Sequence, residues 1–314
     1  MQDILYLVVP CYNEQEVLEE TTRQLTVILE DLIKKKAISE QSRILYVDDG
    51  SKDRTWDLIS EFHRGNRLVM GARLSRNRGH QNALLAGMFT AAQKADMVIS
   101  LDADLQDDVG AIPQFVKEYY KGAEIVYGVR NSRATDTKFK RGTAQLFYKL
   151  LKWMGADIVY NHADYRLMSK RAVLELKNYK EVNLFLRGIV PMIGFKSSTV
   201  YYERHERFAG ESKYPLRKML SFAMDGITSL SVRPLRMITV LGFLIFLISI
   251  VMLVYFLVGA FFGDVVLGWP SLIISIWAIG GLQILGIGVI GEYIGKIYLE
   301  TKERPKYVIE EILD

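Results

Sequence analysis

Acidic and amide side chains follow three runs of residues that are typical of buried β-strands. Asp102 and Asp104 come directly after the apolar run 97–101, and Asp49 comes after the run 43–47. The three polar groups are Cys11-Tyr12-Asn13-Glu14, Asp48-Asp49-Gly50-Ser51 and Asp102-Ala103-Asp104-Leu105-Gln106. In open α/β sheets, ligands bind beyond the carboxyl ends of the strands. We therefore expect these groups to meet in one crevice.

Two carboxylates separated by one residue at a strand end can bind a divalent cation. Oxygen ligands of this kind suit Mg²⁺ or Mn²⁺, and such an ion neutralises a diphosphate leaving group. Asp102 and Asp104 alone are weak evidence, since any acidic turn can contain this pattern. Phosphatases of the haloacid dehalogenase type also use two aspartates after a strand. They place them on the first strand, whereas here they end the fourth predicted strand.

The elements that must position these groups alternate between strand and helix. The predicted strands are 5–10, 43–47, 68–74, 97–101 and 124–127, with a later one at 196–204. The predicted helices between them are 14–36, 55–62, 80–94 and 112–121. Four successive alternations predict an α/β domain with a mostly parallel sheet and right-handed crossovers.

Composition limits the class of protein without selecting its ligand. The chain has 314 residues, 50% of them hydrophobic, and a net charge of +4. A mild basic excess fits nucleic acid, anionic lipid or phosphorylated substrates equally well. The single cysteine, Cys11, excludes an intramolecular disulfide. The apolar segment 4–9 is too short for a signal peptide and fits a first buried strand.

The apolar residues are concentrated in two long segments near the C-terminus. Residues 237–262 carry no charge, and 272–291 contain only Gln283 as a strongly polar residue. Each segment can cross about 30 Å of hydrocarbon. Lysines and arginines flank the pair on its outer sides and are absent from the connecting loop 263–270, so both flanks are expected in the cytoplasm. The amphipathic segment 215–231 fits an interfacial helix. The alternative is that both segments are buried core helices, but a chain of 314 residues has little other structure to cover them.

Several short motifs together resemble glycosyltransferase family 2, in particular its polyprenyl-phosphate branch of bactoprenol glucosyltransferases and dolichol-phosphate mannose synthases. The resemblance covers essentially the whole chain. The matching motifs are Val9-Pro10-Cys11-Tyr12-Asn13-Glu14, Val47-Asp48-Asp49-Gly50-Ser51, Ser75-Arg76-Asn77-Arg78-Gly79, Asp102-Ala103-Asp104-Leu105-Gln106, Ala163-Asp164-Tyr165-Arg166 and Arg207-Phe208-Ala209-Gly210-Glu211-Ser212-Lys213.

The resemblance implies a role for each matching residue. The nucleotide-sugar donor would be bound by Pro10, Tyr12, Asn13, Glu14, Asp49, Gly79, Asp102, Ala103 and Asp104. Asp102, Asp104 and Gln106 would hold Mg²⁺ or Mn²⁺ and the diphosphate. Arg207, Ser212 and Lys213 would bind phosphate from a lid-like segment. Arg130 and Arg166 are further cations that could offset the charge of the acceptor phosphate.

Asp164 occupies the position usually assigned to a catalytic base, but the expected acceptor needs little deprotonation. Phosphate monoesters have a second pKa of about 6 and are largely dianionic at neutral pH. Positioning and charge balance are then the larger tasks. We therefore expect Asp164 to be catalytic, either as a base or by orienting Arg166, Lys213 or the acceptor.

We expect a GT-A-type α/β fold with two C-terminal transmembrane helices. The predicted parts are a cytoplasmic catalytic domain (1–212), an amphipathic linker (213–236), a two-helix membrane region (237–294) and a cytoplasmic tail (295–314). The resemblance implies inverting transfer of one sugar, from a UDP-sugar by preference, to polyprenyl phosphate at the cytoplasmic face of the cell membrane. It also implies a homo-oligomer, with a tetramer suspected, and no nucleic-acid partner.

Two alternatives stay open at this point. A processive polysaccharide synthase would use the same fold, but its Q-x-x-R-W motif and longer membrane region are missing here. A non-catalytic membrane scaffold that binds nucleotide sugar would not need Asp102, Asp104 and Asp164, which are all present. The sugar itself is not specified by the sequence.

Overall fold

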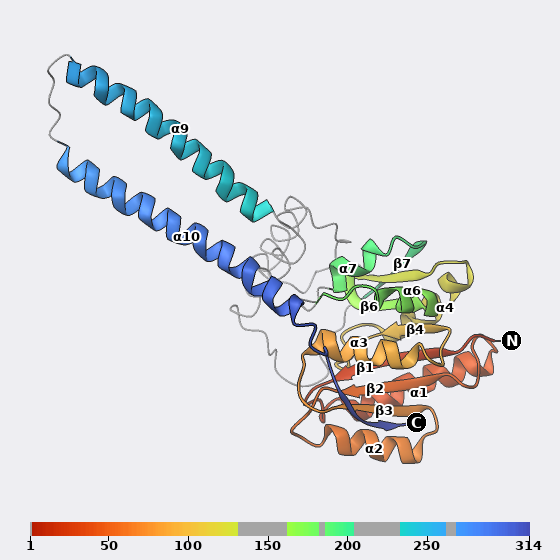
Figure 1. Ribbon diagram of the computed structural model, residues 1–314. Coiled ribbons are helices and arrows are strands. Elements are labelled where there is room, and N and C mark those ends of the chain that lie inside the picture. Colours follow the sequence, from red (N-terminus) through yellow and green to blue (C-terminus); the bar gives the residue numbers. More distant parts are fainter. Residues whose placement is uncertain (1, 131–161, 182–185, 204–232, 262–267) are drawn as a thin grey trace.

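The computed structural model contains an α/β part and two long helices that extend away from it (Figure 1). It describes residues 2–130, 162–181, 186–203, 233–261 and 268–314. The strands are β1 (Leu5–Cys11), β2 (Arg43–Asp48), β3 (Val69–Leu74), β4 (Met97–Ser100), β5 (Ile125–Arg130), β6 (His162–Ser169), β7 (Ser197–Tyr202) and β8 (Ile309–Leu313). The helices are α1 (Leu18–Lys34), α2 (Thr55–Gly65), α3 (His80–Ala91), η1 (Val109–Ala111), α4 (Ile112–Tyr120), α6 (Lys170–Leu176), α7 (Leu186–Met192), α9 (Arg233–Phe261) and α10 (Trp269–Thr301).

The strands form one sheet in the order β7-β5-β6-β4-β1-β2-β3-β8. β1 to β4 run parallel to one another, and in the described sheet only β6 and β8 are antiparallel to their neighbours. The prediction of a mostly parallel α/β sheet is confirmed. β1 is buried along its whole length, as expected for a central strand covered on both faces.

Two apolar cores lie on opposite faces of the sheet. One contains the apolar sides of α1, α2 and α4, with Leu25 and Phe115 fully buried. The other contains α3, α6 and α7, with Ala83 and Val173 fully buried. Because β1 to β4 run parallel between these two layers, their carboxyl ends lie at one common edge.

The C-terminal segment departs from the sequence expectation of a separate tail. α10 continues to Thr301, and the chain then returns to the α/β part and adds β8 to β3 in antiparallel orientation. Leu313 packs against the core formed with α1 and α2. The edge of β3 is thereby covered, which removes a row of unpaired backbone groups.

α9 and α10 lie side by side and correspond to the two predicted membrane spans (Figure 1). Within the part of the chain that the structure describes, the segment Ile279–Thr301 of α10 is long and apolar enough to cross a membrane, judged by length and composition. The predicted interfacial helix at 215–231 lies outside the described residues.

Candidate active site

The loops that follow β1 and β2 are tied together at the carboxyl edge of the sheet. The Asp49 N–H donates to the Cys11 carbonyl at 2.9 Å. Asn13, with a φ of 53°, donates its N–H to the Ser51 hydroxyl at 2.9 Å. The predicted donor-binding residues of the first loop therefore lie beside those of the second.

The predicted donor-binding residues of the loop after β1 differ in their exposure to solvent. Pro10 is buried, whereas Tyr12 is 37% exposed and its ring is available for stacking on a base. The Glu14 N–H donates to the Thr55 hydroxyl at 2.9 Å, which fixes the backbone before α1. The expected helix 14–36 accordingly begins at Leu18.

Asp49 uses its carboxylate to hold the loop between β3 and α3. Its oxygens accept hydrogen bonds from the N–H groups of Arg78 at 2.7 Å and Gly79 at 2.9 Å. Asp49 is 2% exposed, and burial raises its pKa against the opposing effect of these two hydrogen bonds. The carboxylate of Asp49 therefore holds this loop in place and is not directed outward to a ligand.

Gly50, which follows Asp49, allows the loop between β3 and α3 to pack closely against the loop after β2. Its φ is +68°, and a Cβ added there would lie 2.7 Å from the Asn77 nitrogen and 2.8 Å from the Arg76 carbonyl carbon. A side chain would push the two backbones apart. Glycine is thus required both by the left-handed conformation and by the close approach.

The Asp102-Ala103-Asp104 segment is anchored through its middle residue. Ala103 is buried, and its carbonyl accepts a hydrogen bond from the Thr21 hydroxyl of α1 at 2.7 Å. Asp104 accepts from the Gln106 N–H at 3.1 Å. With Ala103 turned into the core, the carboxylates on either side of it remain partly exposed at the carboxyl edge of the sheet, where the crevice is expected.

β6 brings Asp164 next to this segment. The register of the antiparallel pair β4–β6 places Ser100 opposite Arg166, and the Ser100 hydroxyl donates to the Asp164 carbonyl at 2.5 Å. Continued by two residues, this register places Asp164 at the level of Asp102. Two residues separated by 62 positions in the sequence thus lie close enough at the carboxyl edge of the sheet for the charge of Asp164 to act on Asp102.

Two guanidinium groups surround the Asp164 carboxylate. Arg166 donates to Oδ1 at 2.6 Å, and Arg187 of α7 donates to Oδ1 at 3.3 Å and to Oδ2 at 3.1 Å. Burial alone would raise the pKa of Asp164, but the charges of Arg187 and Arg166 outweigh it and hold the pKa well below its ordinary value. Asp164 is therefore a permanent anion at neutral pH.

Arg166 is placed behind Asp164 rather than in the crevice. Its side chain is 2% exposed, and it also donates to the Leu186 carbonyl at 3.3 Å. The expectation of direct acceptor binding fits this position poorly, because a buried guanidinium cannot reach a ligand without leaving Asp164. Arg187, which is 29% exposed, is the more accessible cation of the pair. No motif marked Arg187 in the sequence.

The Asp102 carboxylate lies among other charged groups. His80, the first residue of α3, has its Nε2 3.5 Å from the Asp102 carboxylate. The Asp102 side chain is 41% exposed, and its partial burial, together with the carboxylates of Asp107, Asp104 and Asp164, raises its pKa above the ordinary value, while His80 opposes the rise. So many anions at one strand end produce a field that favours a cation.

Asp102, Asp104 and Gln106 fit a divalent ion whose remaining ligands would come from the substrate and from water. Among the described residues, no three acidic, histidine or cysteine side chains form a ready metal cage. Mg²⁺ is commonly held by one or two carboxylates together with substrate phosphates and water. Asp102 and Asp104 would supply the carboxylates in this arrangement, and Gln106 lies next to them in the same loop.

Arg130, a predicted phosphate-binding residue at the end of β5, lies in a polar network below the same loop. It donates to Asp107 at 3.0 Å and to the Tyr202 hydroxyl at 3.2 Å. The Tyr202 hydroxyl in turn donates to Asp107 at 2.6 Å. Arg130 is 23% exposed, so part of its guanidinium still faces outward. The other predicted phosphate ligands, Arg207, Ser212 and Lys213, lie outside the described residues.

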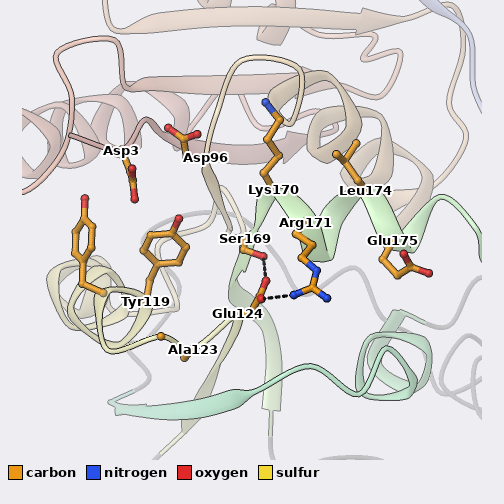
Figure 2. A pocket seen from close by; sticks show the side chains of 12 residues that line it. Asp3, Asp96, Tyr119, Ala123, Glu124, Ser169, Lys170, Arg171, Leu174 and Glu175 are labelled. Atoms are coloured by element: carbon orange, nitrogen blue, oxygen red, sulfur yellow. Dashed lines mark hydrogen bonds and ion pairs between the residues drawn. The ribbon is translucent and has the colours of Figure 1, made fainter. Parts of the chain in front are cut away.

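A separate hollow of about 800 Å³ lies at the opposite edge of the sheet (Figure 2). Asp3 and Asp96 precede β1 and β4, and Glu124 precedes β5 and binds Ser169 and Arg171. This is the amino-terminal edge of the parallel strands, away from Asp102 and Asp164. Its position argues against a role in donor binding.

The mostly parallel α/β sheet, with acidic side chains at its carboxyl edge, is the GT-A-like fold of a glycosyltransferase. The family model "Glycosyl transferase family 2" matches residues 6–176. The chain is 58% identical over 309 residues to "Uncharacterized glycosyltransferase YkoT" of Bacillus subtilis (strain 168), covering 98% of this chain and 92% of that protein. The present chain therefore belongs to glycosyltransferase family 2.

Two further relatives carry more specific names. "Bactoprenol glucosyl transferase" of Shigella phage SfV is 40% identical, with 97% of each chain covered. "Prophage bactoprenol glucosyl transferase homolog" of Escherichia coli (strain K12) is 39% identical, with 98% of each chain covered. The similarity therefore extends through the C-terminal helices, beyond the region that the family model matches.

Proposed function

We propose that this glycosyltransferase moves a single sugar from a UDP-sugar to polyprenyl phosphate at the cytoplasmic face of the cell membrane. The observation that supports the proposal is the β4–β6 pairing, whose register, continued two residues beyond the pair Ser100–Arg166, brings Asp164 to the level of Asp102. The names of the relatives support a polyprenyl-phosphate acceptor and a glucosyl donor.

In the proposed reaction, an oxygen of the lipid phosphate attacks the anomeric carbon, and the bond to the nucleoside diphosphate breaks with inversion. A bound Mg²⁺ or Mn²⁺ would neutralise charge on the departing diphosphate. Asp102 and Asp104 would hold that ion, with Gln106 close by. The first two loops would bind the nucleoside, with Tyr12 available to the base and Asp49 holding the adjacent wall.

Asp164 has a positioning role in this proposal. Because Arg166 and Arg187 hold its pKa well below the ordinary value, it is a poor proton acceptor. A dianionic acceptor phosphate does not need a strong base. Asp164 would instead fix Arg187, and Arg187 with Arg130 would offset the charge of the incoming phosphate together with Arg207, Ser212 and Lys213.

The two long helices would anchor the enzyme. We propose that α9 and α10 each span the membrane and that both termini and the α/β part are cytoplasmic. Support comes from the apolar segment Ile279–Thr301 and from the basic residues on the outer flanks. Assembly into a homo-oligomer, a tetramer by expectation, stays a prediction that mass measurement of the purified protein can test.

The test is transfer of labelled sugar to undecaprenyl phosphate by the full-length protein and by two variants. Asp104→Asn should lower the rate by about 100-fold or more, since metal-assisted charge stabilisation is worth several kcal/mol. Asp57→Asn on α2 removes the same charge at an exposed site and should leave the rate unchanged.

Either of two results contradicts the proposal. Asp104→Asn could transfer sugar at the wild-type rate, which would exclude the assigned metal site. Alternatively, the wild type could bind UDP but transfer no sugar from a panel of UDP-sugars, which would favour a nucleotide-binding scaffold.

A further inference from the structure

A groove between the end of α10 and the α/β part has more basic than acidic side chains in its lining. It has a volume of about 750 Å³ and lies between the second half of α3, the segment 177–180 after α6 and the segment 300–309 that leads into β8. Its charged lining residues are Lys177, Lys180, Arg304, Lys306, Glu300 and Glu303. Four cations from two distant parts of the chain thus face two carboxylates.

The lysine and arginine side chains of this groove are not neutralised by ion pairs within it. Lys177 lies 5.4 Å over the ring of Phe89, and Lys306 donates to the Tyr179 carbonyl at 3.2 Å. Neither contact neutralises charge. Across the described ranges of the chain, no ion pair involves Lys177, Lys180 or Arg304.

Lys306 is the most enclosed cation of the groove. Burial lowers its pKa, while the carboxylates of Glu181 and Glu300 act in the opposite direction. The net lowering means that these two carboxylates compensate only partly for the loss of water around the ammonium group. An anion entering the groove would complete the compensation.

The groove is separate from the catalytic crevice. α3 begins at His80, beside Asp102, and reaches the groove at Phe89. Nine residues of α-helix correspond to about 14 Å along the axis. Phosphates of the donor in the crevice would therefore not occupy the groove.

The location of the groove, at the end of the proposed membrane helix α10, favours a membrane lipid as its ligand. The apolar segment of α10 ends at Thr301, and Glu300 already lines the groove. Lys302 lies 4.4 Å over the ring of Tyr298, an aromatic residue at the level expected for a membrane interface. Lysines and arginines directly beyond a membrane span attract anionic headgroups.

We propose that this groove binds the phosphate-bearing headgroup of an anionic membrane phospholipid. The inference rests on the proposed insertion of α10 into a membrane but not on sugar transfer. A lipid held between α10 and the α/β part would bridge the two, at a point away from the acceptor site.

Binding can be measured by native mass spectrometry of the full-length protein in neutral detergent. Dihexanoyl phosphatidylglycerol is the anionic probe, and dihexanoyl phosphatidylcholine is the zwitterionic probe. The test variant is Lys180→Gln/Arg304→Gln, in which two exposed cations of the groove are removed. Lys34→Gln/Lys117→Gln removes two exposed cations from α1 and α4 and is the matched control. Lys180→Arg/Arg304→Lys keeps the charge of the groove.

The wild type should bind the anionic probe more tightly than the zwitterionic one. The test variant should lose about 30-fold in affinity for the anionic probe, because each Lys or Arg next to anionic lipid contributes about a factor of five. The control and the charge-retaining variant should bind as the wild type does. UDP binding by the same preparations reports on the crevice and separates this inference from the proposed sugar transfer.

Any of four results would overturn the inference. Equal affinity of the wild type for both probes would exclude an anion site. Unchanged binding by the test variant, or an equal loss in the control, would place the site elsewhere. Competition by inorganic phosphate at the same concentration as the lipid probe would assign the groove to a soluble phosphate.

Discussion

The charge cluster of Asp164, Arg166 and Arg187 allows us to rank the loss of stability expected for several substitutions. Asp164→Asn keeps the shape of the side chain but removes the charge that Arg166 and Arg187 share. The Arg166 side chain is 2% exposed, so its charge would be left buried without a counterion. Removing one partner of a buried ion pair costs about 3–5 kcal/mol.

The neighbouring substitutions should have smaller effects. Arg187→Gln leaves Asp164 paired with Arg166, and Arg187 is already 29% exposed, so we expect a loss of about 1 kcal/mol. Asp164→Asn/Arg166→Met leaves no unpaired buried charge. The double variant should therefore lose less than the sum of its two single variants, with a coupling of about 0.5–3 kcal/mol.

The assay is thermal unfolding of the detergent-solubilised protein followed by tryptophan fluorescence at one fixed scan rate. In a domain of about 200 residues, 1 kcal/mol shifts Tm by about 2–4 °C. Asp164→Asn should then lower Tm by about 6–20 °C. A change of about 1 °C or less, or strict additivity in the double variant, would refute the assigned charge cluster.

The pH dependence of this effect has a fixed sign. The folded pKa of Asp164 lies below its unfolded value of about 3.9. A lowered carboxyl pKa contributes stability that is present above the unfolded value and is lost as pH falls toward the folded one. The Tm difference between wild type and Asp164→Asn should therefore stay constant between about pH 5 and 8 and shrink only below about pH 4.

Three further measurements test other parts of the structure. Cys11 is 2% exposed and burial raises its pKa well above the ordinary value, so thiol reagents should label it only in denaturant. Gly50→Ala should destabilise by about 1–3 kcal/mol, because its Cβ would meet the Asn77 nitrogen at 2.7 Å; Gly65→Ala, with open space around it, is the control for the same Tm measurement. Deleting 309–314 should uncover the edge of β3, and size-exclusion chromatography should then show aggregates.

The first half of the fold could be predicted because its strands are short apolar runs closed by polar loops. β1, β2 and β4 lie within a residue or two of their expected ranges. Asp102 and Asp104 could be placed at the carboxyl edge for the same reason. In these strands the apolar sequence matches the buried position in the sheet, so each short run of residues is enough to predict its strand.

β6 shows why part of the site could not be predicted. Its sequence mixes Asp164 and Arg166 with apolar residues, and an arginine in a strand pattern normally indicates exposure. Arg166 is buried because Asp164 and the Leu186 carbonyl accept its hydrogen bonds, and Arg187 adds a second cation. Leu186 and Arg187 belong to α7, about 20 residues further along, and only the fold brings them to β6.

β8 has an equally weak local signal and a larger consequence for the proposed enzyme. Its five residues, Ile309–Leu313, include two glutamates, and its partner β3 lies more than 230 positions earlier. The pairing is extended by a hydrogen bond from the Ser75 N–H to the Val308 carbonyl at 3.0 Å. Ser75 opens the loop whose other end is held by Asp49 at Gly79. The chain that leaves α10 is therefore bonded directly to the loop that forms a wall of the crevice. In a protein anchored by α10, this connection would fix the height and tilt of the crevice relative to the membrane, which a flexible tail could not do.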